Sequence, residues 1–246
     1  MRLGVFDSGV GGLSVLKSLL HAKLFKEYIY YGDTARVPYG VKDKDTIIKF
    51  SLEALEFFKE KKVDMLIIAC NTVSAYALEI LRANAPFPVL GVIDAGVLAV
   101  KNSLKDKNSN ILVIATQATV NSHAYKQALL QEGFLKVEEK ATGLFVPMVE
   151  EGIFHGNFLN AAFEHYFKGL EFKPSALILA CTHFPLIAQA LGEYFGANVK
   201  LIHSGEAIAL QLQQEFDLKT IQEEAAVKFY ASSDVKKLER IAKLWL

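Results

Sequence analysis

The sequence predicts an α/β fold of two lobes related by a pseudo-twofold axis, each a mainly parallel sheet flanked by helices. Short apolar runs typical of buried strands alternate with helical patterns along the chain. This alternation starts again near residue 111. In addition, segments 65–72 and 176–183 resemble each other and contain the only two cysteines among 246 residues. A duplicated α/β unit accounts for all three observations.

The first half of the chain contains four expected strands. Each is a short run of branched, aliphatic or aromatic residues that ends at a polar or small residue. In chain order, these runs are residues 3–7, 28–33, 65–70 and 89–94. Apolar residues at helical spacing predict helices over 46–61 and 73–83, between the strands. Strands joined by helices favour a parallel sheet.

The second half repeats this order. Strands are expected over 111–116 and 176–181, and helices over 122–131 and 186–195. The offsets between matching strands are similar in the two halves, which favours an internal duplication.

The end of the chain adds one more strand and one more helix. The strand is expected over 225–232, and the helix over 234–246 has Leu238, Ile241 and Trp245 on one face together with Ala242. A boundary between the lobes is predicted just after the strand over 89–94, with a return near Ser204.

The composition indicates a small-molecule protein. Lys plus Arg and Asp plus Glu both total 27, so the net charge is zero and no nucleic acid or anionic membrane is expected as a partner. No apolar run approaches the roughly 18 residues of a membrane span. Met1 and Arg2 lead directly into the first strand without the pattern of a signal peptide, so we expect a cytoplasmic location.

Both cysteines are expected at strand ends, where they can act chemically. A reducing cytoplasm disfavours a disulfide, and no metal site is expected because only Cys181 has a nearby histidine. Buried, inert thiols remain an alternative. In a parallel sheet, however, ligands bind at the carboxyl ends of the strands. The following segments, 71–81 and 182–191, are expected helices whose N-termini would lower the pKa of each thiol and attract a carboxylate.

Two facing thiols at such a site indicate inversion of a stereocentre. One base takes a proton from one face of a carbon, and a second acid delivers a proton to the other face. The negative charge that develops beside the carboxylate needs hydrogen-bond donors. Asn71, Thr72 and Thr182, directly after the cysteines, are placed to supply them.

Four motifs carry a resemblance to a known family. Segments 6–14, 31–40, 69–72 and 180–185 occur in the order found in the glutamate racemases of the aspartate/glutamate racemase family, which this chain resembles over most of its length. The resemblance implies a cofactor-independent isomerase that supplies D-glutamate for peptidoglycan synthesis and forms a homodimer. It also implies that the end of the chain rejoins the first lobe, giving domains 1–94 plus 205–246 and 95–204.

The resemblance also implies a role for individual residues. Cys70 would exchange the α-proton of the D-isomer and Cys181 that of the L-isomer. Asp7 would assist Cys70, while His183 with Glu150 would assist Cys181, although the adjacent Glu151 is chemically equivalent. The residues implied to bind substrate are Asp7, Ser8, Tyr39, Gly40, Asn71, Thr72, Thr116, Thr119, Thr182 and His183.

Other interpretations stay open from the sequence. Residues 9–14 follow a strand and nearly match a dinucleotide-binding fingerprint, with Asp33 about twenty residues later. That alternative, a nicotinamide-dependent oxidoreductase, leaves the paired cysteine segments unexplained. A two-lobed amino-acid-binding protein and a racemase for aspartate or another amino acid are further alternatives. Asp7 and Ser8 could also simply cap the helix that follows them.

Overall fold

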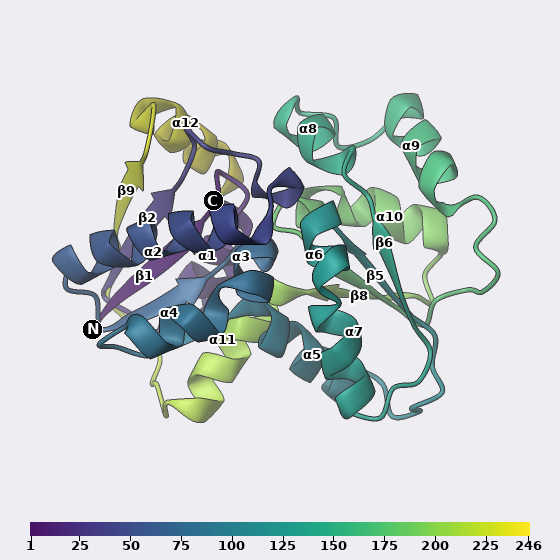
Figure 1. Cartoon of the computed structure of the whole chain (residues 1–246), viewed down its shortest axis with the longest axis horizontal. Helices are drawn as coiled ribbons and strands as arrows, with labels where there is room; N and C mark the ends of the chain where they lie inside the picture. The colour runs from purple at the N-terminus through teal and green to yellow at the C-terminus, as the bar shows by residue number, and fades with distance from the viewer.

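The computed structural model describes residues 1–246 and contains two parallel sheets, side by side in Figure 1. The first sheet has the strand order β4-β3-β1-β2-β9 and the second the order β6-β5-β7-β8. The strands are β1 (Arg2–Asp7), β2 (Glu27–Gly32), β3 (Met65–Ile68), β4 (Val89–Gly91), β5 (Ile111–Ala115), β6 (Val137–Ala141), β7 (Ala176–Ala180), β8 (Lys200–His203) and β9 (Ala226–Ala231). Each sheet with its helices is one lobe, which confirms the predicted α/β fold.

The strand order repeats between the lobes. In the first lobe, β1 pairs with β2 and β3, and β3 pairs with β4. In the second, β5 pairs with β6 and β7, and β7 pairs with β8. The strands before the two cysteines, β3 and β7, therefore occupy matching positions. β9 is added beside β2 at the edge of the first sheet.

Helices cover both faces of each sheet. α1 (Leu13–Ala22), α11 (Ser204–Glu215) and α12 (Val235–Trp245) pack on one face of the first sheet. α2 (Lys44–Glu60), α3 (Asn71–Tyr76) and α4 (Leu78–Asn84) pack on the other. In the second lobe, α7 (Ala124–Gln131) lies on one face and α8 (Phe145–Glu150), α9 (Asn157–Phe167) and α10 (Ala188–Phe195) on the other. Side chains that alternate along each strand supply these four cores.

The strand predicted over 89–94 is too long. β4 ends at Gly91, and α5 (Val92–Ser103) begins at the next residue. The apolar run continues because α5 lies between the lobes: Val92 and Ala95 pack into the first lobe, while Ile93 and Val97 pack into the second. An apolar helix turn that contacts two cores resembles a buried strand in sequence.

The single helix predicted over 182–191 is also wrong. Cys181 is followed by a turn, then the 3-10 helix η2 (Phe184–Ile187), and α10 begins only at Ala188. Phe184 and Ile187 are both fully buried, and residues three apart lie on one side of a 3-10 helix. The helix after Cys70 is interrupted at Ala77, and the one predicted over 122–131 begins at Ala124, after α6 (Gln117–Ser122). Of the two cysteines, only Cys70 therefore precedes an α-helix directly.

Strands β6 and β8 had no counterpart in the sequence prediction. Both lie at the edges of the second sheet, and β6 has the polar sequence Val-Glu-Glu-Lys-Ala. An edge strand that is exposed on one face lacks the continuous apolar run of a central parallel strand. Its polarity hides it from a search for buried strands.

The end of the chain packs on the first lobe. β9 pairs with β2, and Leu238 and Ala242 of α12 are buried in the core formed with α1. We therefore retain the division into 1–94 plus 205–246 and 95–204 as a proposal. None of the helices is both long and apolar enough to span a membrane.

Candidate active site

Both cysteines line one small cavity between the lobes, with a volume of about 30 Å³. It lies where the carboxyl ends of β1, β3, β5 and β7 meet, as expected for parallel sheets. The cavity is lined by Ser8, Val37, Pro38, Tyr39, Gly40, Cys70, Asn71, Thr72, Thr116, Val146, Ala180, Cys181, Thr182 and His183. This volume holds a few water molecules at most. An amino acid is several times larger, so its entry requires the lobes or their side chains to move.

Ten of the thirteen predicted site residues line this cavity, and the other three do not line it. Asp7, Thr119 and Glu150 contact lining residues instead. Sequence reasoning missed four lining residues, Val37, Pro38, Val146 and Ala180, because apolar side chains and turn prolines carry no chemical signature. No group of three or more His, Cys, Asp or Glu side chains is arranged to hold a metal ion. Both cysteines are free.

Cys70 is the N-terminal cap residue of α3 and is almost completely buried. Its thiol donates a hydrogen bond to Ser8 Oγ at 3.5 Å. The expected lowering of its pKa is wrong: burial, followed by the negative charge of Asp7, raises the pKa of Cys70 to about 12. One short helix does not offset these two effects. At neutral pH Cys70 is therefore a thiol, which is ready to donate a proton.

Asp7, the last residue of β1, joins the two lobes. Its Oδ2 accepts a hydrogen bond from the Gly9 N–H at 2.9 Å, and its Oδ1 accepts one from the Thr182 hydroxyl at 3.3 Å. Burial raises the pKa of Asp7, although the positive charge of His183 and these hydrogen bonds oppose the shift. The cap of α1 is Gly12, so Asp7 does not serve as a helix cap.

Cys181, His183 and Glu150 form a line of contacts in the second lobe. The Cys181 Sγ lies 3.8 Å from His183 Nδ1, and His183 Nε2 lies 3.1 Å from Glu150 Oε1. Burial disfavours a charged imidazole, but the contacts with Cys181 and Glu150 outweigh it and raise the pKa of His183 to about 10. His183 therefore carries a positive charge next to the Cys181 sulfur at neutral pH. The neighbouring Glu151 is exposed and makes no such contact.

Three threonines meet across the boundary between the lobes. Thr72 Oγ1 lies 3.0 Å from Thr116 Oγ1 and 3.2 Å from Thr119 Oγ1, and the latter two oxygens are 3.1 Å apart. Thr72 belongs to α3, whereas Thr116 is the N-terminal cap residue of α6 and Thr119 lies within α6. Because each hydroxyl can donate and accept, this cluster can turn a donor toward an anionic group in the cavity.

The lobes approach each other so closely that two glycines are required. A Cβ at Gly11 would lie 2.3 Å from Thr182 Oγ1 and 2.6 Å from His183 Nδ1. A Cβ at Gly40 would lie 2.5 Å from Thr116 Cβ. Ser14 adds a hydrogen bond of 2.8 Å from its hydroxyl to the Thr182 carbonyl. The space beside Gly11 is thus filled by the second lobe.

This packing argues against the dinucleotide alternative. In that interpretation, the glycine-rich turn would receive a pyrophosphate and Asp33 a ribose hydroxyl. Instead, Asp33 is completely buried, accepts a hydrogen bond from Tyr39, and pairs with Arg36 Nε at 2.6 Å. Arg36 is held away from the cavity by Asp33 and Glu53.

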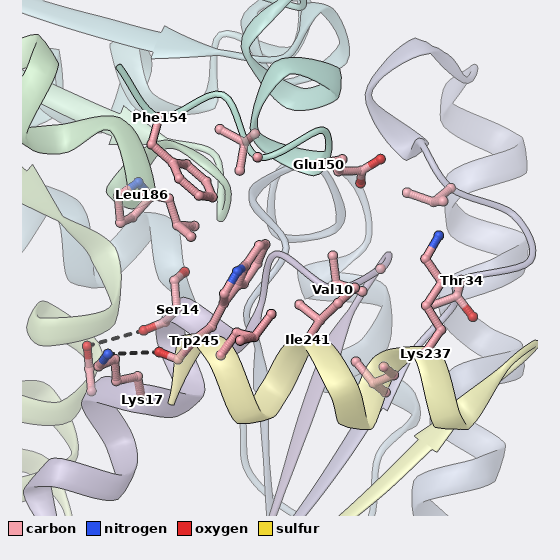
Figure 2. A pocket seen from close by; sticks show the side chains of 18 of the residues that line it. Val10, Ser14, Lys17, Thr34, Glu150, Phe154, Leu186, Lys237, Ile241 and Trp245 are labelled. Carbon is pink, nitrogen blue, oxygen red and sulfur yellow. Dashed lines mark hydrogen bonds between the residues drawn. The ribbon is translucent and has the colours of Figure 1, made fainter. Parts of the chain in front are cut away.

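A second, larger cavity of about 920 Å³ lies beside α12. Figure 2 shows Trp245 of α12 pointing toward Phe154 and Leu186 of the second lobe, with Ile241 beside Val10 and Glu150 at one side. Neither cysteine lines this cavity, and among the predicted site residues only Glu150 does. The paired thiols, rather than size, identify the small cavity as the candidate active site.

Comparison with known proteins gives the same family throughout the chain. Residues 7–212 match the Asp/Glu/hydantoin racemase family. The glutamate racemase of Campylobacter jejuni subsp. jejuni serotype O:2 is 63% identical over 246 residues, covering 100% of this chain and 98% of that protein. A crystal structure of glutamate racemase from Campylobacter jejuni subsp. jejuni matches with a TM-score of 0.98, at 63% identity, over 100% of this chain and 98% of that chain. The Francisella tularensis glutamate racemase in complex with D-glutamate matches with a TM-score of 0.88 at 35% identity, over 100% of this chain and 93% of that chain.

Proposed function

Because this chain belongs to the Asp/Glu/hydantoin racemase family, we propose that it is a glutamate racemase that interconverts L- and D-glutamate with two cysteine thiols and no cofactor. It is thus an isomerase, in agreement with the resemblance carried by its four motifs. The observation that carries the mechanism is the placement of Cys70 and Cys181, from opposite lobes, on the wall of one cavity.

The reaction from L-glutamate begins at Cys181. Its thiolate removes the α-proton and becomes a thiol, leaving negative charge on Cα and the adjacent carboxylate. The positive charge of protonated His183, whose Nδ1 lies 3.8 Å from the sulfur, favours the thiolate form of Cys181 that this transfer needs. The Cys70 thiol then gives its proton to the opposite face of Cα and becomes a thiolate. D-glutamate has formed, and the two cysteines have exchanged their protonation states.

Hydrogen-bond donors stabilise the charge between these two transfers. Asn71, Thr72 and Thr182 line the cavity directly after the cysteines, and Thr116 faces Thr72. Donors held in a closed, dry site stabilise a developing negative charge more strongly than water does. We propose that these four residues, with Ser8 and the Tyr39–Gly40 backbone, bind the two carboxylates and the amino group of glutamate.

Further parts of the proposal concern the cell. We propose that the protein is a cytoplasmic homodimer and that its D-glutamate is used in peptidoglycan synthesis. The homodimer and the role in peptidoglycan synthesis are supported by the resemblance to the family.

The activity itself gives the first prediction. We expect the purified protein, dialysed against a chelator and given no cofactor, to racemise L- and D-glutamate and leave aspartate nearly untouched. The change of circular dichroism with time measures both directions. Because the enantiomers have equal free energies, the two kcat/KM values must agree. Turnover of aspartate alone would support the alternative of an aspartate racemase. Binding of glutamate without turnover would support the alternative of an amino-acid-binding protein.

The second prediction concerns Glu150. We expect Glu150→Gln to move the alkaline loss of kcat/KM for L-glutamate to lower pH by about one unit or more, because the Glu150 charge helps to raise the pKa of His183. Glu151→Gln, at the exposed neighbour, is the matched control and should keep the wild-type profile. Because the pKa of His183 is higher in the folded protein, protonation of His183 stabilises the fold at pH values below its ordinary pKa of 6.5. This stabilisation is lost as the pH rises toward 10. Identical pH profiles for the two variants would contradict a role for Glu150.

A further inference from the structure

A tyrosine outside the predicted site contacts Asn71, which lines the small cavity. Tyr125, in α7 of the second lobe, is completely buried. Its hydroxyl donates a hydrogen bond of 2.7 Å to Asn71 Oδ1, in the first lobe and 54 positions earlier in the chain. Asn71 follows Cys70 directly and lines the cavity. The sequence carries no sign of this contact, because Tyr125 lies in none of the four motifs.

The two ends of the Asn71 side chain have opposite hydrogen-bonding roles. The oxygen only accepts hydrogen bonds, and the NH₂ group only donates them. Burial raises the pKa of Tyr125 well above its ordinary value, so its hydroxyl keeps its proton and remains a donor under all assay conditions. The Asn71 oxygen is therefore occupied by Tyr125. Its NH₂ group is left as the end that is available to the cavity.

We propose that Tyr125 is a positioning residue, which holds the Asn71 amide so that its NH₂ group faces a carboxylate of the substrate beside Cys70. This inference rests on the proposed racemase function and deepens it. The charge that forms when Cα loses its proton spreads onto the neighbouring carboxylate. An amide turned the other way would present an oxygen to that negative charge and raise the barrier.

The surroundings of Tyr125 explain how it can hold a fixed orientation. Its hydroxyl also lies 3.5 Å from Ser204 Oγ, at the start of α11. Gly96 of α5 packs against the ring, since a Cβ there would be 3.2 Å from the Tyr125 Cε1 atom and the hydroxyl oxygen. α5 and α11 are the two helices at which the chain passes between the lobes. The Tyr125 hydroxyl therefore lies where α5 and α11 approach Asn71. Asn71 belongs to the first lobe, so its amide is oriented by a residue of the second lobe.

The variant Tyr125→Phe tests this inference against the matched control Tyr28→Phe. Tyr28 is equally buried, and its hydroxyl donates a hydrogen bond of 2.9 Å to the Leu19 carbonyl in the core of the first lobe, away from the cavity. We expect both variants to lose a similar amount of thermal stability. Only Tyr125→Phe should lose kcat/KM, by roughly tenfold and by the same factor from L- and D-glutamate. Tyr28→Phe should stay within about twofold of the wild type.

A double-mutant cycle separates an effect through Asn71 from a general effect on packing. In an Asn71→Ala background, Tyr125→Phe should change kcat/KM by less than about twofold, because the amide that it positions is gone. If the factors by which Tyr125→Phe and Asn71→Ala each lower kcat/KM multiply in the double variant, the inference is overturned. Equal kcat/KM for Tyr125→Phe, Tyr28→Phe and the wild type would overturn it as well.

A second variant tests the amide orientation without changing Tyr125. Asn71→Asp keeps an acceptor for the Tyr125 hydroxyl but replaces the NH₂ donor by a carboxylate oxygen. At pH 8 we expect it to lose more kcat/KM than Asn71→Ala, since that oxygen repels the substrate carboxylate. Activity equal to or above that of Asn71→Ala would overturn the inference. Absence of turnover by the wild-type protein would instead overturn the proposed function, and this inference with it.

Discussion

We expect Cys70→Ser and Cys181→Ser each to lower kcat/KM for glutamate racemisation by roughly a thousandfold, in both directions. A serine hydroxyl is much less acidic than a thiol, so it supplies too little anion at neutral pH to remove an α-proton. It is also a poorer proton donor to Cα. Because each turnover uses both residues in the proposed mechanism, replacing either one should block both directions. The measurement is the change of circular dichroism with time, starting from each enantiomer.

The substitution itself is a mild change, which makes this test specific. Serine is nearly the same size as cysteine, and the Cys70 and Cys181 side chains are buried without any covalent bond between them. We therefore expect thermal unfolding close to that of the wild type. A cysteine variant that keeps most of its activity would contradict the two-thiol mechanism, even if the protein proves to be a glutamate racemase.

In D₂O, nearly all of the first product should carry deuterium at Cα, while the unreacted substrate stays protiated. Cys70 and Cys181 come from opposite lobes and line one cavity, so a substrate bound at the proposed site would lie between them. The proton that one thiolate removes is therefore not the proton that the other thiol returns. Proton NMR of early product, sampled before a tenth of the substrate has reacted, measures the fraction of label for each enantiomer.

A single acid/base residue would give a different pattern. It would return the same hydrogen to the product, or it would exchange label into recovered substrate before product forms. Substantial retention of the original α-hydrogen in early product would therefore contradict the assignment of Cys70 and Cys181 as separate acid/base residues. The outcome does not depend on the similarity of this chain to any other protein.

Cys70 differs from Cys181 in the charges around it, and this difference bears on the direction of proton flow. Burial and the negative charge of Asp7 both raise the pKa of Cys70, whereas Cys181 contacts the protonated His183. In the proposed mechanism, proton donation by Cys70 and proton removal by Cys181 correspond to the conversion of L- to D-glutamate. The reverse reaction must begin from the state in which the two protons have been exchanged.

Much of the architecture follows from local patterns in the sequence. Central strands of a parallel sheet are buried on both faces, so β1, β3, β5 and β7 are continuous apolar runs that end at recognisable polar residues. Parallel strands bring those ends to one edge, which is why both cysteines could be expected at a shared site. The four motifs add the family and the residues expected at the site, because residue type and spacing are present in the sequence itself.

Only the tertiary structure decided the environment of those residues. The high pKa of Cys70 depends on burial and on Asp7, 63 positions away, and overrides the helix N-terminus that local reasoning favoured. The choice of Glu150 over Glu151 depends on which carboxylate reaches His183. The hydrogen bond from Tyr125 to Asn71 joins the two lobes. Periodicity and spacing report on residues that are close together in the sequence. Desolvation and charge act between segments that only the fold brings together.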